Sequence, residues 1–293
     1  MIGGILAAVE SVTGCRVVAR HDPPGSGYTP AIRFVAELDS GDRVFVKAAP
    51  DEHIGGWIQP EISFYRSIDG AVLPGFVGSG EVAADGAPVL VIDDLSQARW
   101  PPPWDEEAIV AVCTALDRLH THPRSAVVPS IEVLHPGFAS GWETVAEDPA
   151  VLLGTGLCTE PWLTEVLPQF QLAAGRAPLT GDSLCHLDVR SDNLCLMRDD
   201  GSARLIDWNQ ACRANAELDL ACWVPSLSAE LGRDPDELGF DIDPGLAAVV
   251  AGFFAARAGL PPIPKAPRVR DVQLAQLAVA LPWAARRCGF AAP

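Results

Sequence analysis

Two short motifs near the middle of the chain restrict its fold more than any other feature. The first, HLDVRSDNLCL (186–196), places Asp188 two positions after a histidine and Asn193 five positions after Asp188. The second, ARLIDW (203–208), is a strand-like run that ends on another acid, Asp207. The stretch NLCLMRDDGSARLIDW predicts a strand, a turn at Gly201 and a second strand. Asp188, Asn193 and Asp207 can therefore converge at the open end of this hairpin.

These three oxygen-bearing side chains indicate a magnesium and nucleotide site. Mg²⁺ takes one or two carboxylates or amides from a protein and fills its other positions with phosphate oxygens and water. Asn193 and Asp207 suit as ligands of such an ion. Asp188 would then be free to orient and deprotonate an attacking hydroxyl group.

The N-terminal part of the chain predicts an antiparallel sheet. Residues 16–20 and 31–37 have the composition of strands and are separated by the turn-rich stretch HDPPGSGYTP. A hairpin follows, with its turn at Asp39–Asp42 and its second strand in RVFVKAA. Because side chains alternate along a strand, Lys47 lies on the face opposite the two valines of this strand.

The stretch WIQPEISFYRSIDG (57–70) predicts a helix, with Pro60 in its first turn and Gly70 at its end. Glu61 falls at helical spacing beside the apolar stripe of this helix. A buried glutamate is costly unless it has a partner, and the nearest candidate is Lys47. Alternatively, Glu61 lies at the edge of the stripe in water. The spacing alone leaves both interpretations open.

The later part of the chain is predicted to be mainly helical. The apolar strand PVLVIDDLS (88–96) breaks into acids and then into ARWPPPW, which indicates a crossing between two lobes. We therefore predict an α+β, bilobal chain. Residues 1–95 would form a nucleotide-binding lobe with an antiparallel sheet and one main helix, and residues 96–293 a mainly helical lobe with catalytic and acceptor-binding residues.

The composition of the chain excludes some classes of binding partner and indicates where the protein is located. Lys and Arg number 21 against 38 Asp and Glu, and the formal net charge of −17 disfavours nucleic acid and anionic membranes as partners. The eight cysteines form no CxxC pair and are typical of reduced core residues in a cytosolic protein. The N-terminus has no basic start and meets Glu10 early, which is unlike a secretory signal. We therefore expect a cytoplasmic protein.

Taken together, the motifs resemble the aminoglycoside phosphotransferase family, which has a protein-kinase-like fold. The resemblance implies that Lys47, held by Glu61, contacts the α- and β-phosphates of ATP. It implies that Asp188 accepts the proton of the acceptor hydroxyl, and that Asn193 and Asp207 hold Mg²⁺ against the phosphates. In the same way, His186 resembles a structural member that braces the loop, and Asp219 an acid that ties the loop down.

Further site residues follow from the same resemblance. Gly25 and Gly27, in GSGYTP, would cover the phosphates, and the backbone near Asp93 and Leu95 would bind the edge of adenine. Arg190 could offer its charge to the γ-phosphate or pair with Asp192, and both options stay open.

Two departures from protein-kinase patterns bear on the acceptor. GSGYTP lacks the third glycine of the phosphate loop of protein kinases, and no P-loop motif occurs, which excludes a P-loop NTPase. Trp208 replaces the phenylalanine that follows the metal-binding aspartate in protein kinases, and no activation segment separates Asp207 from Asp219. These features favour a small-molecule acceptor.

The predicted function is therefore ATP-dependent transfer of the γ-phosphoryl group to a hydroxyl of a small molecule. Acceptors in the resembling family include antibiotics such as aminoglycosides, which points to antibiotic resistance, and other amino- or sugar-containing compounds. The alternatives are a small-metabolite kinase that acts on a sugar or amino alcohol, and a catalytically silent nucleotide-binding module.

A metal hydrolase is a further rival. It would use His120, His122, His186 and Asp188, although there is no HExxH motif. The pair His120 and His122 is more typical of a helix C-terminus facing the helix dipole.

Two groups of residues in the predicted helical lobe allow more than one interpretation. Its tryptophans could stack on a ring-shaped acceptor or form the core, and they are Trp142, Trp162, Trp223 and Trp283. Its acids could attract an amine or form a solvated helix face, and they are Glu230, Asp234, Asp236, Glu237, Asp241 and Asp243.

Overall fold

The computed structural model describes residues 2–23, 30–264 and 266–293. It divides into two compact units: Met1–Arg118 with Ser191–Ala211, and Leu119–Arg190 with Cys212–Pro293. The predicted lobes divide the chain at a different place, between residues 95 and 96. The difference has a physical reason, since the backbone of Arg99 pairs with that of Leu196 through two hydrogen bonds of 2.9 and 2.8 Å. The segment after residue 95 is thereby tied to the hairpin of the first unit.

The first unit is built on a five-stranded antiparallel sheet in the order β1-β2-β3-β5-β4. Its strands are β1 (Val17–His21), β2 (Ile32–Leu38), β3 (Arg43–Ala48), β4 (Phe76–Glu81) and β5 (Pro88–Asp93). The predicted hairpin joins β2 and β3, and its turn places Gly41 at a φ of 92°, a conformation that glycine adopts without strain.

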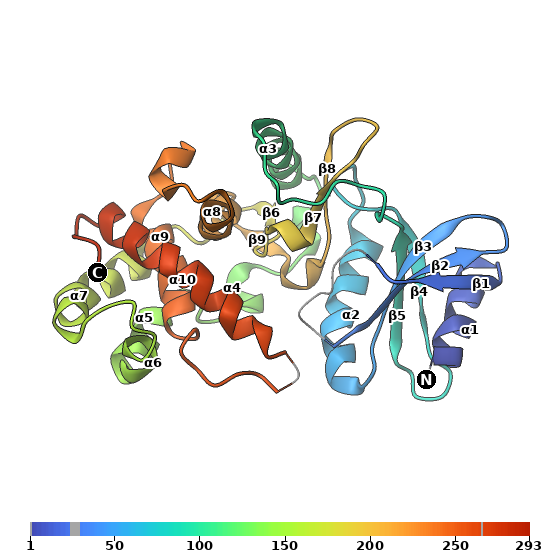
Figure 1. Cartoon of the computed structure of the whole chain (residues 1–293), viewed down its shortest axis with the longest axis horizontal. Coiled ribbons are helices and arrows are strands. Elements are labelled where there is room, and N and C mark those ends of the chain that lie inside the picture. Colours follow the sequence, from blue (N-terminus) through green and yellow to red (C-terminus); the bar gives the residue numbers. More distant parts are fainter. Residues whose placement is uncertain (1, 24–29, 265) are drawn as a thin grey trace. The chain divides into compact units, whose positions relative to one another are not determined.

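The two faces of this sheet are covered by different helices (Figure 1). Helix α1 (Ile2–Thr13) packs on the face that carries Val44 and Val46, where it closes an apolar core. Helix α2 (Glu52–Ser67) lies on the face of Lys47, because its Glu61 contacts that lysine. The predicted alternation of β3 is therefore confirmed, and it leaves one buried polar position on the α2 face.

Helix α2 begins earlier than predicted. The side chain of Asp51 accepts a hydrogen bond of 3.0 Å from the N–H of Ile54 and so caps the helix, and Pro60 lies inside it rather than in its first turn. The position of Pro60 in the first turn was thus predicted wrongly. Proline is tolerated here because both it and Gly56, whose carbonyl loses a helical partner, face solvent.

The predicted central hairpin is present in the first unit. Strands β7 (Leu194–Leu196) and β8 (Ala203–Leu205) pair in antiparallel fashion, and Gly201 takes a φ of 69° in the turn. The pairing continues past the strands, since the N–H of Ile206 donates to the carbonyl of Asn193 at 2.9 Å. This bond places Asn193 next to the residue that precedes Asp207.

The second unit is mainly helical, with one small sheet of β6 (Ser183–Cys185) and β9 (Cys212–Ala214). Its α-helices are α4 (Ile131–Leu134), α5 (Gly141–Glu147), α6 (Ala150–Leu153), α7 (Glu160–Arg176), α8 (Glu217–Leu231), α9 (Pro244–Ala255) and α10 (Arg268–Arg287). Helix α3 (Glu106–His120) runs across the boundary of the two units. The short 3₁₀ turns are Ser125–Val127, Ser191–Asn193, Trp208–Gln210 and Pro235–Leu238.

The tryptophans of the second unit are mostly core residues. Trp142, Trp223 and Trp283 are buried, whereas Trp162 is half-buried. Trp142 stacks on Phe170 with a ring distance of 4.4 Å, and its indole N–H donates to a backbone carbonyl of α9 at 2.7 Å. Packing thus accounts for the three buried indoles.

Three of the predicted acids of the second unit have structural partners. Asp234 and Asp236 contact Arg286 at 2.7 and 3.0 Å, and Asp243 caps α9 through the N–H of Gly245 at 2.7 Å. These contacts explain these three acids without an amine ligand. None of the helices in the described part of the chain is long and apolar enough to cross a membrane.

Candidate functional site

Lys47 is the centre of a buried ion cluster in the first unit. Its Nζ lies 2.7 Å from Oε2 of Glu61 and 2.7 Å from Oδ1 of Asp207. The side chains of Lys47 and Glu61 are 9% and 2% exposed, so the pair is shielded from water, whereas that of Asp207 is 26% exposed. The predicted pairing of Glu61 with Lys47 is therefore present, and the alternative of a solvated Glu61 is wrong.

Burial and charge act in opposite directions on this cluster. Burial alone lowers the pKa of Lys47, but the nearby carboxylates of Asp207 and Glu61 outweigh it and raise that pKa above its usual value. Burial raises the pKa of Glu61, and the positive charge of Lys47 only partly offsets this. Lys47 thus stays protonated.

Asp207 is positioned by the residues on both sides of it. It follows β8 and has the left-handed backbone conformation, with φ 66° and ψ 58°. The next residue, Trp208, stacks on Phe64 of α2 with a ring distance of 4.5 Å and an interplanar angle of 7°. This strained conformation is held by packing on one side and by the ion pair with Lys47 on the other.

Asn193 and Asp207 lie at the same end of the hairpin, as the sequence predicts. Asn193 is 3% exposed, and its carbonyl accepts the N–H of Ile206. A buried amide and a partly exposed carboxylate supply the oxygen donors that Mg²⁺ prefers. The donor set therefore fits a magnesium site, and this role stays a prediction.

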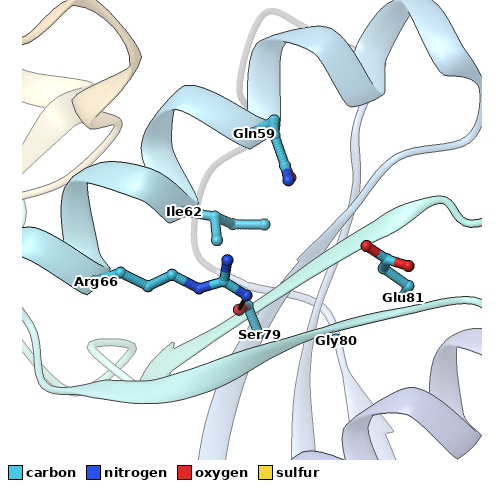
Figure 2. Close-up of a pocket in the computed structure, with 6 residues that line it drawn as sticks. All are labelled: Gln59, Ile62, Arg66, Ser79, Gly80 and Glu81. Atoms are coloured by element: carbon cyan, nitrogen blue, oxygen red, sulfur yellow. Dashed lines mark hydrogen bonds between the residues drawn. The ribbon is translucent and has the colours of Figure 1, made fainter.

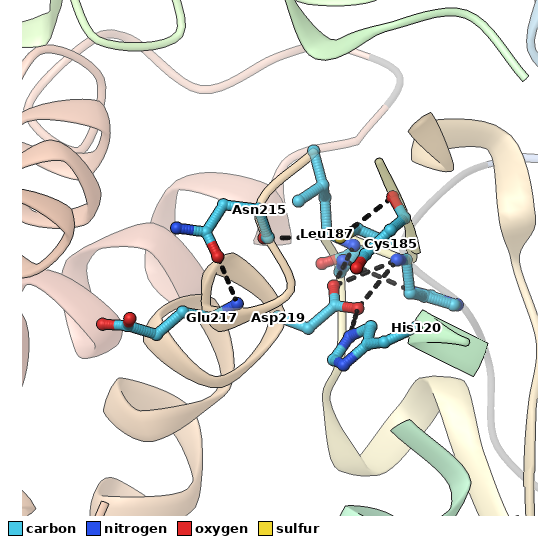
Figure 3. A network of polar contacts seen from close by, with 9 residues as sticks. His120, Cys185, Leu187, Asn215, Glu217 and Asp219 are labelled. Carbon is cyan, nitrogen blue, oxygen red and sulfur yellow. Dashed lines mark hydrogen bonds and ion pairs between the residues drawn. The ribbon is translucent and has the colours of Figure 1, made fainter. Parts of the chain in front are cut away.

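The second unit holds the loop that leads to Asp188 (Figure 3). Asp219, in the first turn of α8, is fully buried and accepts hydrogen bonds from the N–H groups of His186, at 3.0 Å, and Leu187, at 2.7 Å. Its other oxygen lies 2.9 Å from Nε2 of His120. Leu187 has a φ of 62°, which is unfavourable for leucine, so these bonds hold a strained backbone in place just before Asp188.

Asp188 itself reaches solvent. Its side chain is 31% exposed, and its backbone N–H donates to Nδ1 of His186 at 3.2 Å. Nη1 of Arg190 lies 3.4 Å from Oδ1 of Asp188, a contact that neither prediction for Arg190 named. The carboxylate is thus accessible to solvent and has a cation beside it.

The structure does not test the other predicted nucleotide contacts. Gly25 and Gly27 lie outside the described residues. Asp93 ends β5, where its N–H donates to the carbonyl of Gly75 at 2.9 Å and its carboxylate accepts the N–H of Gly75 at 2.8 Å. The carbonyl of Leu95 accepts hydrogen bonds from two groups further along the chain. Adenine binding at Asp93 and Leu95 stays a prediction.

A metal hydrolase site is not supported. Within the described ranges, His120, Cys185 and Asp219 form a group whose possible ligand atoms lie within 4.8 Å of one another. The carboxylate of Asp219 is already occupied by hydrogen bonds, and burial raises the pKa of Cys185 far above its usual value. A neutral thiol and a filled carboxylate make a poor cation site.

The sequence did not identify two residues that lie close to these predicted site residues. His120 was interpreted as a helix end facing the dipole, yet it contacts Asp219, which is 99 residues away along the chain. Arg33 lies directly opposite Lys47 in the β2–β3 pairing. The sequence did contain a signal for Arg33. Arg33 and Lys47 are equally far along the chain from Ser40 in the hairpin turn, and residues placed in this way pair across the two strands.

Helix α2 is anchored to β4 on a second side (Figure 2). Nη2 of Arg66 donates to Oγ of Ser79 at 2.7 Å, and both residues line a polar hollow. The hollow is lined by Gln59, Ile62, Arg66, Ser79, Gly80 and Glu81. Together with the contact of Glu61 to Lys47, this bond fixes the helix against the sheet.

Replacing Asp219 by alanine should lower the free energy of unfolding by about 2–5 kcal/mol, because it leaves the buried N–H of His186 and the partly buried N–H of Leu187 without an acceptor. Urea unfolding monitored by circular dichroism measures the change. Asp182→Ala is the matched control in the same unit, since the side chain of Asp182 is 98% exposed, and its stability should equal that of the wild type. Equal unfolding midpoints for Asp219→Ala and the control would contradict the proposed bracing.

Comparison of the sequence with models of protein families finds no match, and comparison with curated proteins finds none either. Among solved structures, the GDP and kanamycin complex of APH(2")-IIia is similar over 96% of this chain and 97% of that chain, with 14% identity and a TM-score of 0.58. An aminoglycoside phosphotransferase from Alicyclobacillus acidocaldarius is similar over 96% and 93%, with 16% identity and a TM-score of 0.54. An ethanolamine kinase from Plasmodium vivax is similar over 88% and 81%, with 14% identity and a TM-score of 0.54. The predicted fold class is confirmed: the chain has the α+β, protein-kinase-like fold of these phosphotransferases.

Proposed function

We propose that the protein transfers the γ-phosphoryl group of ATP to a hydroxyl group of a small molecule. The observation that carries this proposal is the buried cluster of Lys47, Glu61 and Asp207, with both ion pairs at 2.7 Å. A buried lysine is costly and persists where its charge is needed. In a fold shared with phosphotransferases, the phosphates of a nucleotide are the natural ligand of that charge.

Each residue of the set has a distinct role in this proposal. Lys47, oriented by Glu61, binds the phosphates. Asp188 accepts the proton of the attacking hydroxyl, for which its partly exposed carboxylate is suited. Arg190, beside Asp188, stabilises negative charge that develops during the transfer.

Asn193 and Asp207 would hold the magnesium ion. When bound, Mg²⁺ supplies charge neutralisation for the phosphates of the nucleotide. The contribution of the chain is to present the two oxygen donors from one end of the β7–β8 hairpin. In the structure Asp207 pairs with Lys47, so the same carboxylate joins the lysine to the proposed ion site.

The similar structures and the sequence support a proposal for the acceptor class. An aminoglycoside is named for one similar structure, and ethanolamine for another. Both carry amines and hydroxyl groups, and the net charge of −17 favours cationic acceptors over anionic ones. We therefore propose hydroxylated amines as acceptors, with antibiotic inactivation as the role that aminoglycoside acceptors would indicate.

The test is a phosphorylation screen with the full chain. Purified protein, ATP and Mg²⁺ are incubated with aminoglycosides, macrolides, amino sugars and amino alcohols, and products are detected by mass spectrometry as a phosphate adduct. We expect at least one acceptor to gain a phosphoryl group. Mg²⁺-dependent nucleotide binding without transfer to any acceptor would favour a silent binding module instead.

A further inference from the structure

Arg33 shares a sheet face with Lys47. The two residues are direct partners in the β2–β3 pairing, and directly opposed residues of antiparallel strands point to the same side. The other side of the sheet is filled by the core under α1, which includes Phe34 and Val46, the chain neighbours of Arg33 and Lys47. Arg33 therefore lies on the face that carries the buried ion cluster.

The charge of Arg33 acts on this cluster. Burial lowers the pKa of Arg33, while the carboxylates of Asp207 and Glu61 raise it in part. In the reverse direction, the positive charge of Arg33 is among the causes that lower the pKa of Glu61. An arginine keeps its proton under these conditions, because its usual pKa lies far above neutral pH.

The cluster has no net charge when Arg33 is counted. Lys47 and Arg33 each carry one positive charge, and Glu61 and Asp207 each carry one negative charge. Without Arg33, the net charge of the site would be −1, in a chain whose total is −17. Before Mg²⁺ binds, such a site would repel the phosphates of a nucleotide, because their negative charges would face two carboxylates and a single lysine.

We propose that Arg33 is a second cation of the nucleotide site, whose guanidinium group binds the phosphate tail beside Lys47. This inference rests on the proposed function. A guanidinium group matches phosphate oxygens with two parallel N–H donors, which a lysine does not offer. Arg33 thereby supplies both charge and orientation where Lys47 is already engaged by two carboxylates.

The test compares two ligands that differ only in their phosphates. The affinities of the full chain for ADP with Mg²⁺ and for adenosine are measured by isothermal titration calorimetry. In Arg33→Gln, the affinity for ADP should fall by about tenfold or more, and that for adenosine should change by less than about twofold. Arg20→Gln is the matched control, because Arg20 is exposed and pairs with Ala36 on the opposite face of the sheet; it should bind both ligands as the wild type does.

A second variant keeps the test decisive if glutamine prevents folding. Arg33→Lys retains the charge of the cluster but not the paired donors, so it should fold and still bind ADP about threefold more weakly than the wild type. An unchanged ratio of the two affinities in both variants would overturn the role of Arg33. If the wild-type chain itself binds neither ligand, the proposed function fails first, and the inference falls with it.

Discussion

Replacing Asp188 by asparagine is expected to lower turnover by about 10²–10⁴, or roughly 3–5 kcal/mol of transition-state stabilisation. Asparagine keeps the size of the side chain and can still contact Arg190, which lies 3.4 Å from the carboxylate. It cannot accept a proton from the acceptor hydroxyl. The loss should therefore appear in kcat, with little change in the affinity for nucleotide.

The measurement is a steady-state assay on the best acceptor found in the screen, paired with calorimetric binding of ADP. Asp182→Asn is the control, because its carboxylate belongs to the same unit and is 98% exposed. Near-normal turnover in Asp188→Asn would show that another group takes the proton. Loss of nucleotide affinity as large as the loss of turnover would instead indicate damage to the fold.

The parts of the fold that could be predicted are those that local patterns determine. The β2–β3 and β7–β8 hairpins follow from turn residues between strand-like runs, and the face of Lys47 follows from the alternation of a strand. The convergence of Asn193 with Asp207 needs only that hairpin. No long-range packing had to be known.

The remaining features depend on packing between distant segments. The start of α2 is set by the cap at Asp51, whereas the proline signal at Pro60 suggested a later start. The spacing in the sequence left the partner of Glu61 open, and only the packing of α2 on the sheet shows that it is Lys47. The contact of His120 with Asp219 joins α3 to α8, and no motif or spacing in the sequence predicts it.

The ion cluster also shows why the resemblance to a family could not identify every charged residue around Lys47. A motif names residues at fixed spacing, and Arg33 belongs to no such motif. Its place opposite Lys47 comes from the register of the hairpin, and its effect on Glu61 comes from burial of the cluster. Pairing register and charge balance are thus needed in addition to motifs to find every cation that acts on this cluster.

Replacing Asp207 by asparagine should change the response of nucleotide binding to magnesium. The wild-type chain is expected to bind ADP more tightly when Mg²⁺ is added, because Asp207 would supply a charged oxygen to the ion. The variant should lose about 10–100-fold of this enhancement. Without Mg²⁺ the order reverses: asparagine removes a negative charge 2.7 Å from Lys47, so the variant should bind ADP at least as tightly as the wild type.

Glu61→Gln is the matched control for this reversal. It also removes a negative charge 2.7 Å from Lys47, but Glu61 is not a proposed ligand of the ion. Its binding of ADP should therefore keep the Mg²⁺ enhancement of the wild type. Calorimetric titrations with and without Mg²⁺ on the three proteins separate the effects. An intact enhancement in Asp207→Asn would contradict the proposed ion site at this hairpin, because the effect of Mg²⁺ on binding would then not depend on the carboxylate of Asp207.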